Sequence, residues 1–72
     1  MQYAIVIETA SGSSNYSAYV PDLPGCIRTG RTIEEIKRNM QEAIELHIEG
    51  LRADGLPIPE PTTAVATVDV AA

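Results

Sequence analysis

The chain has no tryptophan or phenylalanine, and its 72 residues include only one cysteine and one histidine. A single cysteine excludes an intrachain disulfide, and Cys26 with His47 is too small a set for a zinc site. A chain of this length buries only about 60% of the surface that its unfolded form exposes, so its stability is marginal without further support. With no disulfide, metal or cofactor expected, we predict self-association into a dimer or larger homo-oligomer.

Basic residues are also scarce, since five lysines and arginines stand against ten acidic residues and give a net charge of −5. Such a surface repels a phosphate backbone, which argues against nucleic-acid binding and favours a basic partner. Solubility alone is the plainer explanation of the charge. No apolar run approaches the ~20 residues of a membrane span, and no signal peptide is recognisable, so we expect a cytoplasmic protein without a membrane partner.

Hydrophobic alternation predicts strands over 2–9, 16–20, 26–31 and 64–70, with a polar loop over 10–15. The three prolines of the segment 56–63 make it a proline-rich connector to the last strand. The residues thus form a single domain, 1–72, with the order βββαβ. We expect an α+β fold in which an antiparallel three-stranded meander gains a fourth strand beside the first, and one helix packs on one face.

The predicted helix has a clear start and stop. Thr32 and Glu35 have the spacing of a capping box, and Gly55 suits the left-handed residue that ends a helix. Between them, apolar residues recur at intervals of three and four: Ile33, Ile36, Met40, Ala43, Ile44, Ile48 and Leu51. This stripe should cover the sheet, while an acidic ridge faces outward. The second face of the sheet then needs another surface, which is a further reason to expect self-association.

A turn rich in proline follows the second strand. Pro21, Pro24 and Gly25 leave the backbone little freedom between two strands. The string Tyr16-Ser17-Ala18-Tyr19-Val20-Pro21-Asp22-Leu23-Pro24-Gly25-Cys26 resembles the Y-x-A-x-x-P-D-L-P-G-C segment of the HicB family of antitoxins. The helix fits the family pattern at Thr32, Glu35, Asn39, Glu42, Ala43 and Ile44, and the resemblance extends over about 1–63.

This resemblance implies a partial ribonuclease H-like, HicB-like fold and a specific partner. The partner is a HicA-type toxin, a small basic protein that cleaves messenger RNA, and the antitoxin binds it directly and occludes its RNA-binding surface. No catalytic residue and no cofactor are implied. Many family members continue into a segment that binds operator DNA, whereas no second helix is recognisable in this sequence. We therefore expect no direct nucleic-acid binding by this chain.

Two groups of residues are candidates for contact with the partner. The first lies at the Pro-Gly turn, where an aromatic, an acid and a leucine stand together as Tyr19, Asp22 and Leu23. The second is the acidic ridge of the helix with its lone leucine, namely Glu42, Glu45, Leu46 and Glu49. Each has a plainer alternative, because Asp22 suits a role in holding the turn and a single exposed leucine is common.

Two other functions compete with the antitoxin. One is a stand-alone regulatory or scaffold module that binds something other than a toxin. The other is a residual ribonuclease H-like nuclease, which would need several carboxylates around a divalent metal. Glu8 and Asp69 are the candidates outside the helix, but both stand near the ends of their predicted strands. We therefore predict that the protein is not an enzyme.

Overall fold

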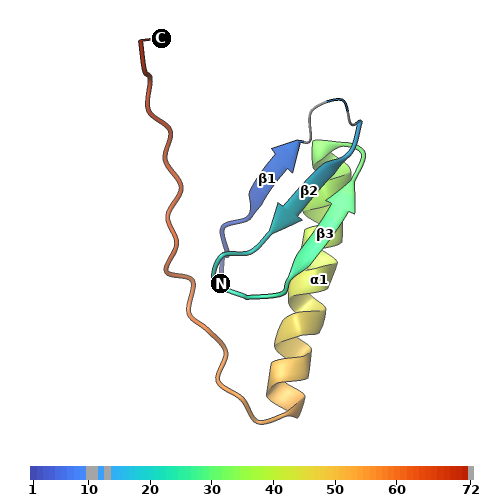
Figure 1. The fold of residues 1–72 in the computed structure, drawn as a ribbon. Coiled ribbons are helices and arrows are strands. Elements are labelled where there is room, and N and C mark those ends of the chain that lie inside the picture. The colour runs from blue at the N-terminus through green and yellow to red at the C-terminus, as the bar shows by residue number, and fades with distance from the viewer. Residues whose placement is uncertain (10–11, 13, 72) are drawn as a thin grey trace.

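The computed structural model describes residues 1–9, 12 and 14–71, and the regular secondary structure of these residues is a three-stranded sheet followed by one long helix (Figure 1). The strands are β1 (Val6–Thr9), β2 (Tyr16–Tyr19) and β3 (Ile27–Gly30), and the helix is α1 (Ile33–Ala53). The strands lie in the order β1-β2-β3 with both pairs antiparallel. The predicted meander and helix are confirmed, while half of the loop predicted over 10–15, namely residues 10, 11 and 13, lies outside the described residues.

The first strand is shorter than the alternation of apolar residues predicts. Val6 pairs with Tyr19, so the same register would set Ala4 opposite Pro21. A proline has no backbone N–H to give to a ladder, and there the chain already turns away from the sheet. Residues 2–5 therefore extend past the end of the pairing between β1 and β2.

Both ends of α1 are capped as the sequence predicts. The Thr32 hydroxyl accepts a hydrogen bond from the Glu35 amide at 3.0 Å, which satisfies one of the free donors of the first turn. At the other end Gly55 has a positive φ of 67°, its amide donates to Arg52, and the Leu56 amide donates to Leu51. These two bonds form a Schellman motif, which fixes the direction in which the chain leaves the helix.

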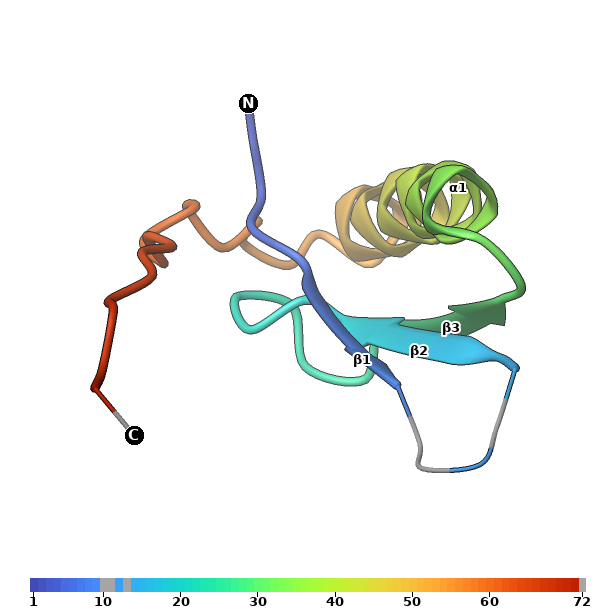
Figure 2. The ribbon, with the colours of Figure 1, turned by 90° about the horizontal axis from the view of Figure 1, so that it is seen from above.

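The core lies between α1 and the face of the sheet formed by β2 and β3 (Figure 2). Its buried side chains are Ala18, Val20, Leu23, Cys26, Ile36, Met40 and Ala43. Gly30 allows the close approach of the helix, because a Cβ at this position would lie 3.0 Å from the backbone nitrogen of Ile36. The core is thus confined to one side of the sheet and to the first half of the helix.

The other face of the sheet has no helix over it (Figure 2). Val6, Tyr19 and Ile27 are neighbours across the three strands in the hydrogen-bonding register, so they form an apolar row on this face. The side chains of Tyr19 and Ile27 are 41% and 55% exposed. The sequence prediction that one helix leaves a partly apolar second face is consistent with this row.

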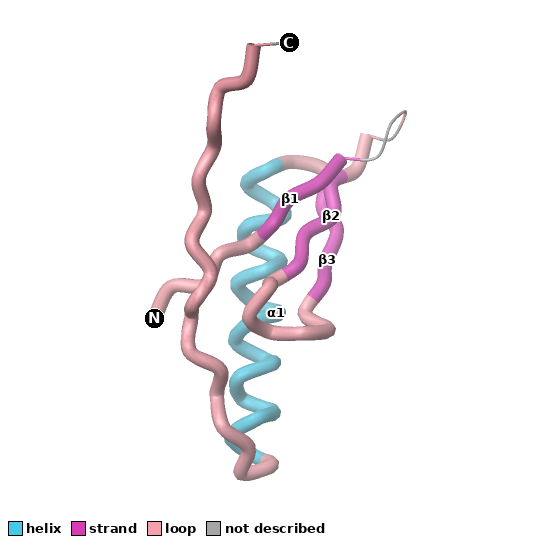
Figure 3. Tube along the Cα trace, turned by 60° about the vertical axis from the view of Figure 1, so that its left-hand side comes forward, coloured by secondary structure: helices cyan, strands magenta, loops and turns pink. Residues whose placement is uncertain are grey.

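The predicted fourth strand is not seen. From Leu56 to Ala71 the chain is extended and belongs to no strand of the described sheet (Figure 3). Prolines at 57, 59 and 61 cannot donate to a ladder, and two threonines that follow them are bonded to Asp22 instead of to β1. Val65, Val68 and Val70 are consequently 71–83% exposed. The expectation of βββαβ is corrected to βββα with an extended C-terminal segment.

Candidate partner-binding surfaces

The outer face of α1 carries part of the predicted acidic ridge. Glu42, Leu46 and Glu49 follow one another at intervals of four and three residues, so they lie on the same face of the helix. All three are exposed, and Leu46 has 62% of its surface accessible. A single aliphatic side chain between two carboxylates is suited to a partner that has an apolar pocket with basic residues around it.

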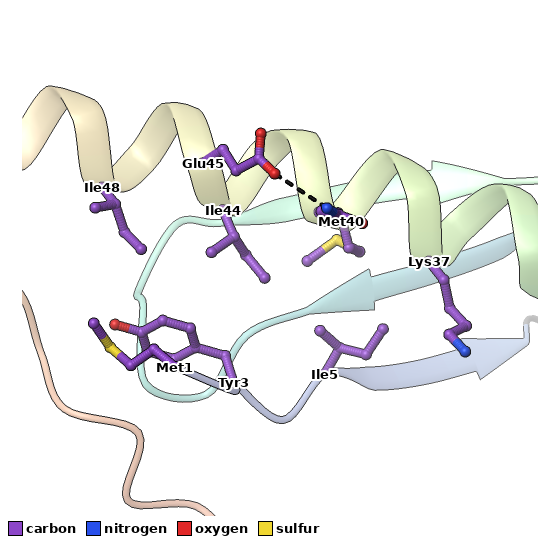
Figure 4. Close-up of a pocket in the computed structure, with 9 residues that line it drawn as sticks. Met1, Tyr3, Ile5, Lys37, Met40, Ile44, Glu45 and Ile48 are labelled. Atoms are coloured by element: carbon purple, nitrogen blue, oxygen red, sulfur yellow. Dashed lines mark hydrogen bonds between the residues drawn. The ribbon is translucent and has the colours of Figure 1, made fainter.

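Glu45 points to another side of the helix, at the rim of an apolar groove (Figure 4). Gln41 donates a hydrogen bond to the Glu45 carboxylate at 3.2 Å and holds it beside the groove. The groove has a volume of about 470 Å³ and separates α1 from the chain segment that precedes β1. Its apolar lining comes from Met1, Tyr3, Ile5, Met40, Ile44 and Ile48, and Lys37 stands at one end.

Tyr19 lies on the uncovered face of the sheet, in the row with Val6 and Ile27. The helix covers the opposite face, as the complete burial of its neighbour Ala18 shows. Tyr19 and the acidic ridge are therefore not parts of one surface.

Leu23 is buried within the Pro-Gly turn. The turn is tied by hydrogen bonds from the Leu23 amide to Val20 and from the Cys26 amide to Leu23, both 3.1 Å long. Gly25 supplies the positive φ of 85° that closes it. With 0% of its surface exposed, Leu23 fills the core and is not available to a partner that leaves the fold intact.

Asp22 binds the C-terminal segment through four hydrogen bonds. Its carboxylate accepts from the amide and hydroxyl of Thr62 at 3.2 and 3.0 Å, and from those of Thr63 at 3.1 and 2.9 Å. Partial burial raises the pKa of Asp22, but the hydrogen bonds from the two threonines outweigh it and place the pKa below the ordinary value of an aspartate. We call this arrangement the Asp22 clamp.

A second contact holds the same segment to the start of the chain. The Tyr3 hydroxyl donates a hydrogen bond of 2.6 Å to the carbonyl oxygen of Pro59. Tyr3 also lines the groove, so the C-terminal segment passes one end of the groove (Figures 3 and 4). The prolines that the sequence identifies as a connector are thus anchored to the fold at two points.

The carboxylates expected of a nuclease do not come together. Glu8 is exposed at the end of β1, and Asp69 is exposed in the extended C-terminal segment. Among the residues that the structure describes, no group of three acidic, histidine or cysteine side chains is arranged to hold a metal ion. Burial raises the pKa of the Cys26 thiol, while Arg28 acts in the opposite direction, so this cysteine is a poor nucleophile at neutral pH.

Sequence reasoning missed the groove and the Asp22 clamp. A signal for the groove was present, because an apolar stripe that runs to Ile48 and Leu51 is longer than three short strands can cover. Nothing in the sequence pairs Asp22 with Thr62 and Thr63, since they are 40 and 41 residues apart. Only the path of the folded chain brings them together.

The comparison with protein families gives a match over residues 3–71 to the HicB-like antitoxin of bacterial toxin-antitoxin systems. The chain belongs to the HicB-like antitoxin family. Antitoxins of this family are generally non-catalytic. The resemblance found in the Pro-Gly turn and the helix is thereby confirmed over nearly the whole chain.

Relatives of this HicB-like chain occur in bacteria, archaea and a phage. It is 39% identical over 59 residues to a UPF0150 protein of Helicobacter pylori, covering 81% of this chain and 82% of the relative. A UPF0150 protein of Thermoplasma acidophilum is 37% identical over 68 residues, which is 94% of this chain and 97% of the relative. A 14.9 kDa protein of Haemophilus phage HP1 is 42% identical over 60 residues, but this chain covers only 44% of its length.

A solved structure shares the fold of this HicB-like chain. It is a chain from the HicA3 and HicB3 toxin-antitoxin complex, with a TM-score of 0.71 and 35% sequence identity. The match covers 86% of this chain and 70% of the other. In the described residues, no helix is both long and apolar enough to cross a membrane.

Proposed function

We propose that this chain is the antitoxin of a type II toxin-antitoxin pair and neutralises a HicA-type, mRNA-cleaving toxin by binding it directly. The observation that carries the proposal is the likeness, at 35% identity, to a chain solved in a HicA3 and HicB3 toxin-antitoxin complex. Membership of the HicB-like antitoxin family supports it independently of that single structure.

The outer face of α1 is the surface that we assign to the toxin. An enzyme that cleaves RNA must attract phosphates, so its substrate site is basic, and a carboxylate-rich surface can take the place of the RNA. Glu42 and Glu49 supply the carboxylates of this face, and Leu46 supplies an apolar contact that can be buried between them. Glu45 adds a third carboxylate at the rim of the groove. Binding there would occlude the toxin without any chemical step by the antitoxin.

The turn offers a second position for the same partner. Tyr19 is exposed close to the turn, but the Asp22 carboxylate already accepts hydrogen bonds from Thr62 and Thr63. A basic side chain of the toxin would have to compete with these bonds. We therefore assign the contact to the helix, and Tyr19, which lies on the other side of the sheet, is the alternative position.

The test is association with a purified HicA-type toxin, measured by surface plasmon resonance between about 50 and 500 mM salt. Exposed charges are screened at the higher value, so association should slow steeply. Reversal of Glu42, Glu45 and Glu49 to lysine should lower the association rate. Replacement of Leu46 by serine should instead speed dissociation, as loss of a buried contact does.

The control is Tyr19→Ala with Asp22→Ala, which alters the turn and leaves the helix unchanged. If this variant dissociates quickly while the helix variants bind normally, the turn is the anchor and the assignment of the helix is wrong. If the folded wild-type chain neither binds nor inhibits a HicA-type toxin, including any that is encoded beside its own gene, the antitoxin function itself is refuted. A stand-alone binding module is then the better interpretation.

A further inference from the structure

The groove between α1 and the segment that precedes β1 leaves apolar side chains partly exposed to water. Ile44 and Ile48 lie on the helix wall and Ile5 lies on the opposite wall, and all three are only partly buried (Figure 4). The volume of about 470 Å³ falls within the range of about 300–1,000 Å³ that is typical of binding sites. Burial of these side chains by a partner would therefore be favourable.

Hydrogen bonds hold two polar side chains of the groove in position. The Tyr3 hydroxyl donates to the carbonyl oxygen of Pro59, which fixes the ring of Tyr3 in the groove wall. At the rim, the side-chain amide of Gln41 donates to the carboxylate of Glu45. A site with ordered walls loses less conformational entropy when a partner binds than a site that must first be ordered.

The groove continues into the surface that we assign to the toxin. A second depression adjoins it, and the lining of this depression consists of Met1, Glu45, Ile48, Glu49 and Arg52. Three of these residues also line the groove. At 100° per residue, Glu49 lies about 40° around the helix from Glu45, and Leu46 lies about 100° from it in the same direction. The groove, its acidic rim and Leu46 thus form one continuous strip that a single partner can cover.

We propose that the groove anchors the HicA-type toxin by receiving apolar side chains from the toxin segment that meets the acidic ridge. This inference rests on the proposed function and deepens it, because Leu46 is otherwise the only apolar contact. Exposed ion pairs contribute little free energy, so the acidic ridge mainly speeds association. Buried apolar contacts slow dissociation, and the groove is where α1 and the segment before β1 together provide them.

The charges around the groove define the order of charges that the toxin segment needs. Glu45 and Glu49 place two carboxylates along the middle of this side of the helix. Lys37 stands before them in the chain and Arg52 after them. A segment laid along α1 therefore gains from basic residues at its middle, whereas a lysine or arginine at either end meets a like charge. A uniformly basic surface is disfavoured, so the groove also selects among basic partners.

Methyl cross-saturation by NMR, in the complex of the full chain with a purified HicA-type toxin, tests the proposal without a mutation. The antitoxin is deuterated except for its isoleucine methyl groups, and irradiation of the toxin protons reduces only the signals of methyl groups in contact with the toxin. Ile5, Ile44 and Ile48 should lose intensity. Ile27, on the uncovered face of the sheet, is the internal control and should keep its intensity. Full intensity at Ile44 and Ile48 would overturn the proposal.

Two substitutions at one position test the same contact by surface plasmon resonance. Ile48→Ser removes an apolar contact, and Ile48→Trp fills the groove with a larger side chain. Each should raise the dissociation rate constant for the toxin by about tenfold. Val68→Ser is the matched control, because Val68 is 83% exposed on the C-terminal segment, and it should leave dissociation unchanged. Circular dichroism shows whether each variant remains folded.

The outcomes distinguish this inference from the proposed function. If the toxin binds the wild-type chain and both Ile48 variants equally well, the groove is not the anchor, but the antitoxin function stands. If the Ile48 variants change only the sedimentation of the free chain, a second copy occupies the groove and the proposal is overturned in the same way. If the wild-type chain does not bind the toxin, the proposed function and this inference are both refuted.

Discussion

Gly30 of β3 lies directly against Ile36 of α1, so that the two elements meet without a side chain between them. A Cβ on Gly30 would stand 3.0 Å from the backbone nitrogen of Ile36 and 3.1 Å from its Cα. These are main-chain atoms of the first helical turns and cannot rotate aside. The helix would have to move off the sheet and loosen the contacts of Ile36, which is 0% exposed.

We therefore predict that Gly30→Ala destabilises the fold by about 1–3 kcal/mol, the usual cost of an added group in a close-packed contact. Gly50→Ala is the control, because a Cβ there meets no atom within 4 Å. Gly50 lies within the helix, so alanine should stabilise it by about 0.5–1 kcal/mol. Urea unfolding followed by circular dichroism measures both. Equal effects of the two substitutions would contradict the close contact.

The core beneath the helix gives a second prediction. Met40 is 1% exposed, so Met40→Ala should remove buried contacts, leave a cavity and cost about 2–5 kcal/mol. In a domain with roughly 5 kcal/mol of stability, much of the population would unfold near room temperature. Leu46→Ala, at a side chain that is 62% exposed, should leave the thermal midpoint almost unchanged. A normal melting curve for Met40→Ala would show that this side chain is not part of the core.

The Asp22 clamp predicts a specific dependence on pH. The pKa of Asp22 is lowered in the folded chain, so the clamp contributes fully above the pKa of an unfolded aspartate, about 3.9. Its contribution is lost as the pH falls through the lower pKa of the folded state. Hydrogen exchange of the Thr62 and Thr63 amides, corrected for the intrinsic rate, should therefore be slow at neutral pH and accelerate only in strong acid.

The variant Asp22→Asn provides the control for this clamp. An asparagine presents a neutral amide to four donors, so Thr62 and Thr63 should exchange quickly at neutral pH while the amides of α1 keep their protection. Exchange at Thr62 and Thr63 that is unaffected by both acid and the substitution would show that Asp22 does not hold the segment.

The separation of the carboxylates predicts that the chain does not cleave nucleic acid. Glu8 and Asp69 do not converge, so an RNA–DNA hybrid should remain intact in the presence of magnesium or manganese. Cleavage that disappears in Glu8→Gln or in Asp69→Asn would contradict this prediction. Cleavage that survives both substitutions would indicate a contaminating nuclease.

Local signals in the sequence are sufficient for most of the fold. The cap at Thr32, the end at Gly55 and the three- and four-residue spacing of Ile36, Met40 and Ala43 each act within a few turns of helix, and each is confirmed. The fourth strand was predicted from alternation alone, but alternation does not supply a pairing partner. A strand forms only where another backbone lies alongside, which depends on the complete path of the chain.

In the candidate surfaces, too, some features follow from local sequence signals and others depend on tertiary contacts. The exposure of Glu42, Leu46 and Glu49 follows from helical geometry, which the sequence contains. Leu23 is adjacent to Asp22 in the same turn, yet one side chain is buried and the other binds Thr62 and Thr63. Which way each points is set by tertiary contacts that the turn motif by itself does not specify.

The Asp22 clamp also has a consequence for the order of folding. The strands and α1 join residues that are close in sequence, whereas the clamp closes a loop of about 40 residues. Closing a long loop costs conformational entropy, and the contact at its ends offsets this cost only when the rest of the chain is already folded. The clamp should therefore form after the transition state for folding has been crossed. Loss of the Asp22 carboxylate should then leave the folding rate unchanged and appear only as faster unfolding. The C-terminal segment should therefore be the last part of the chain to dock during folding and the first to detach during unfolding.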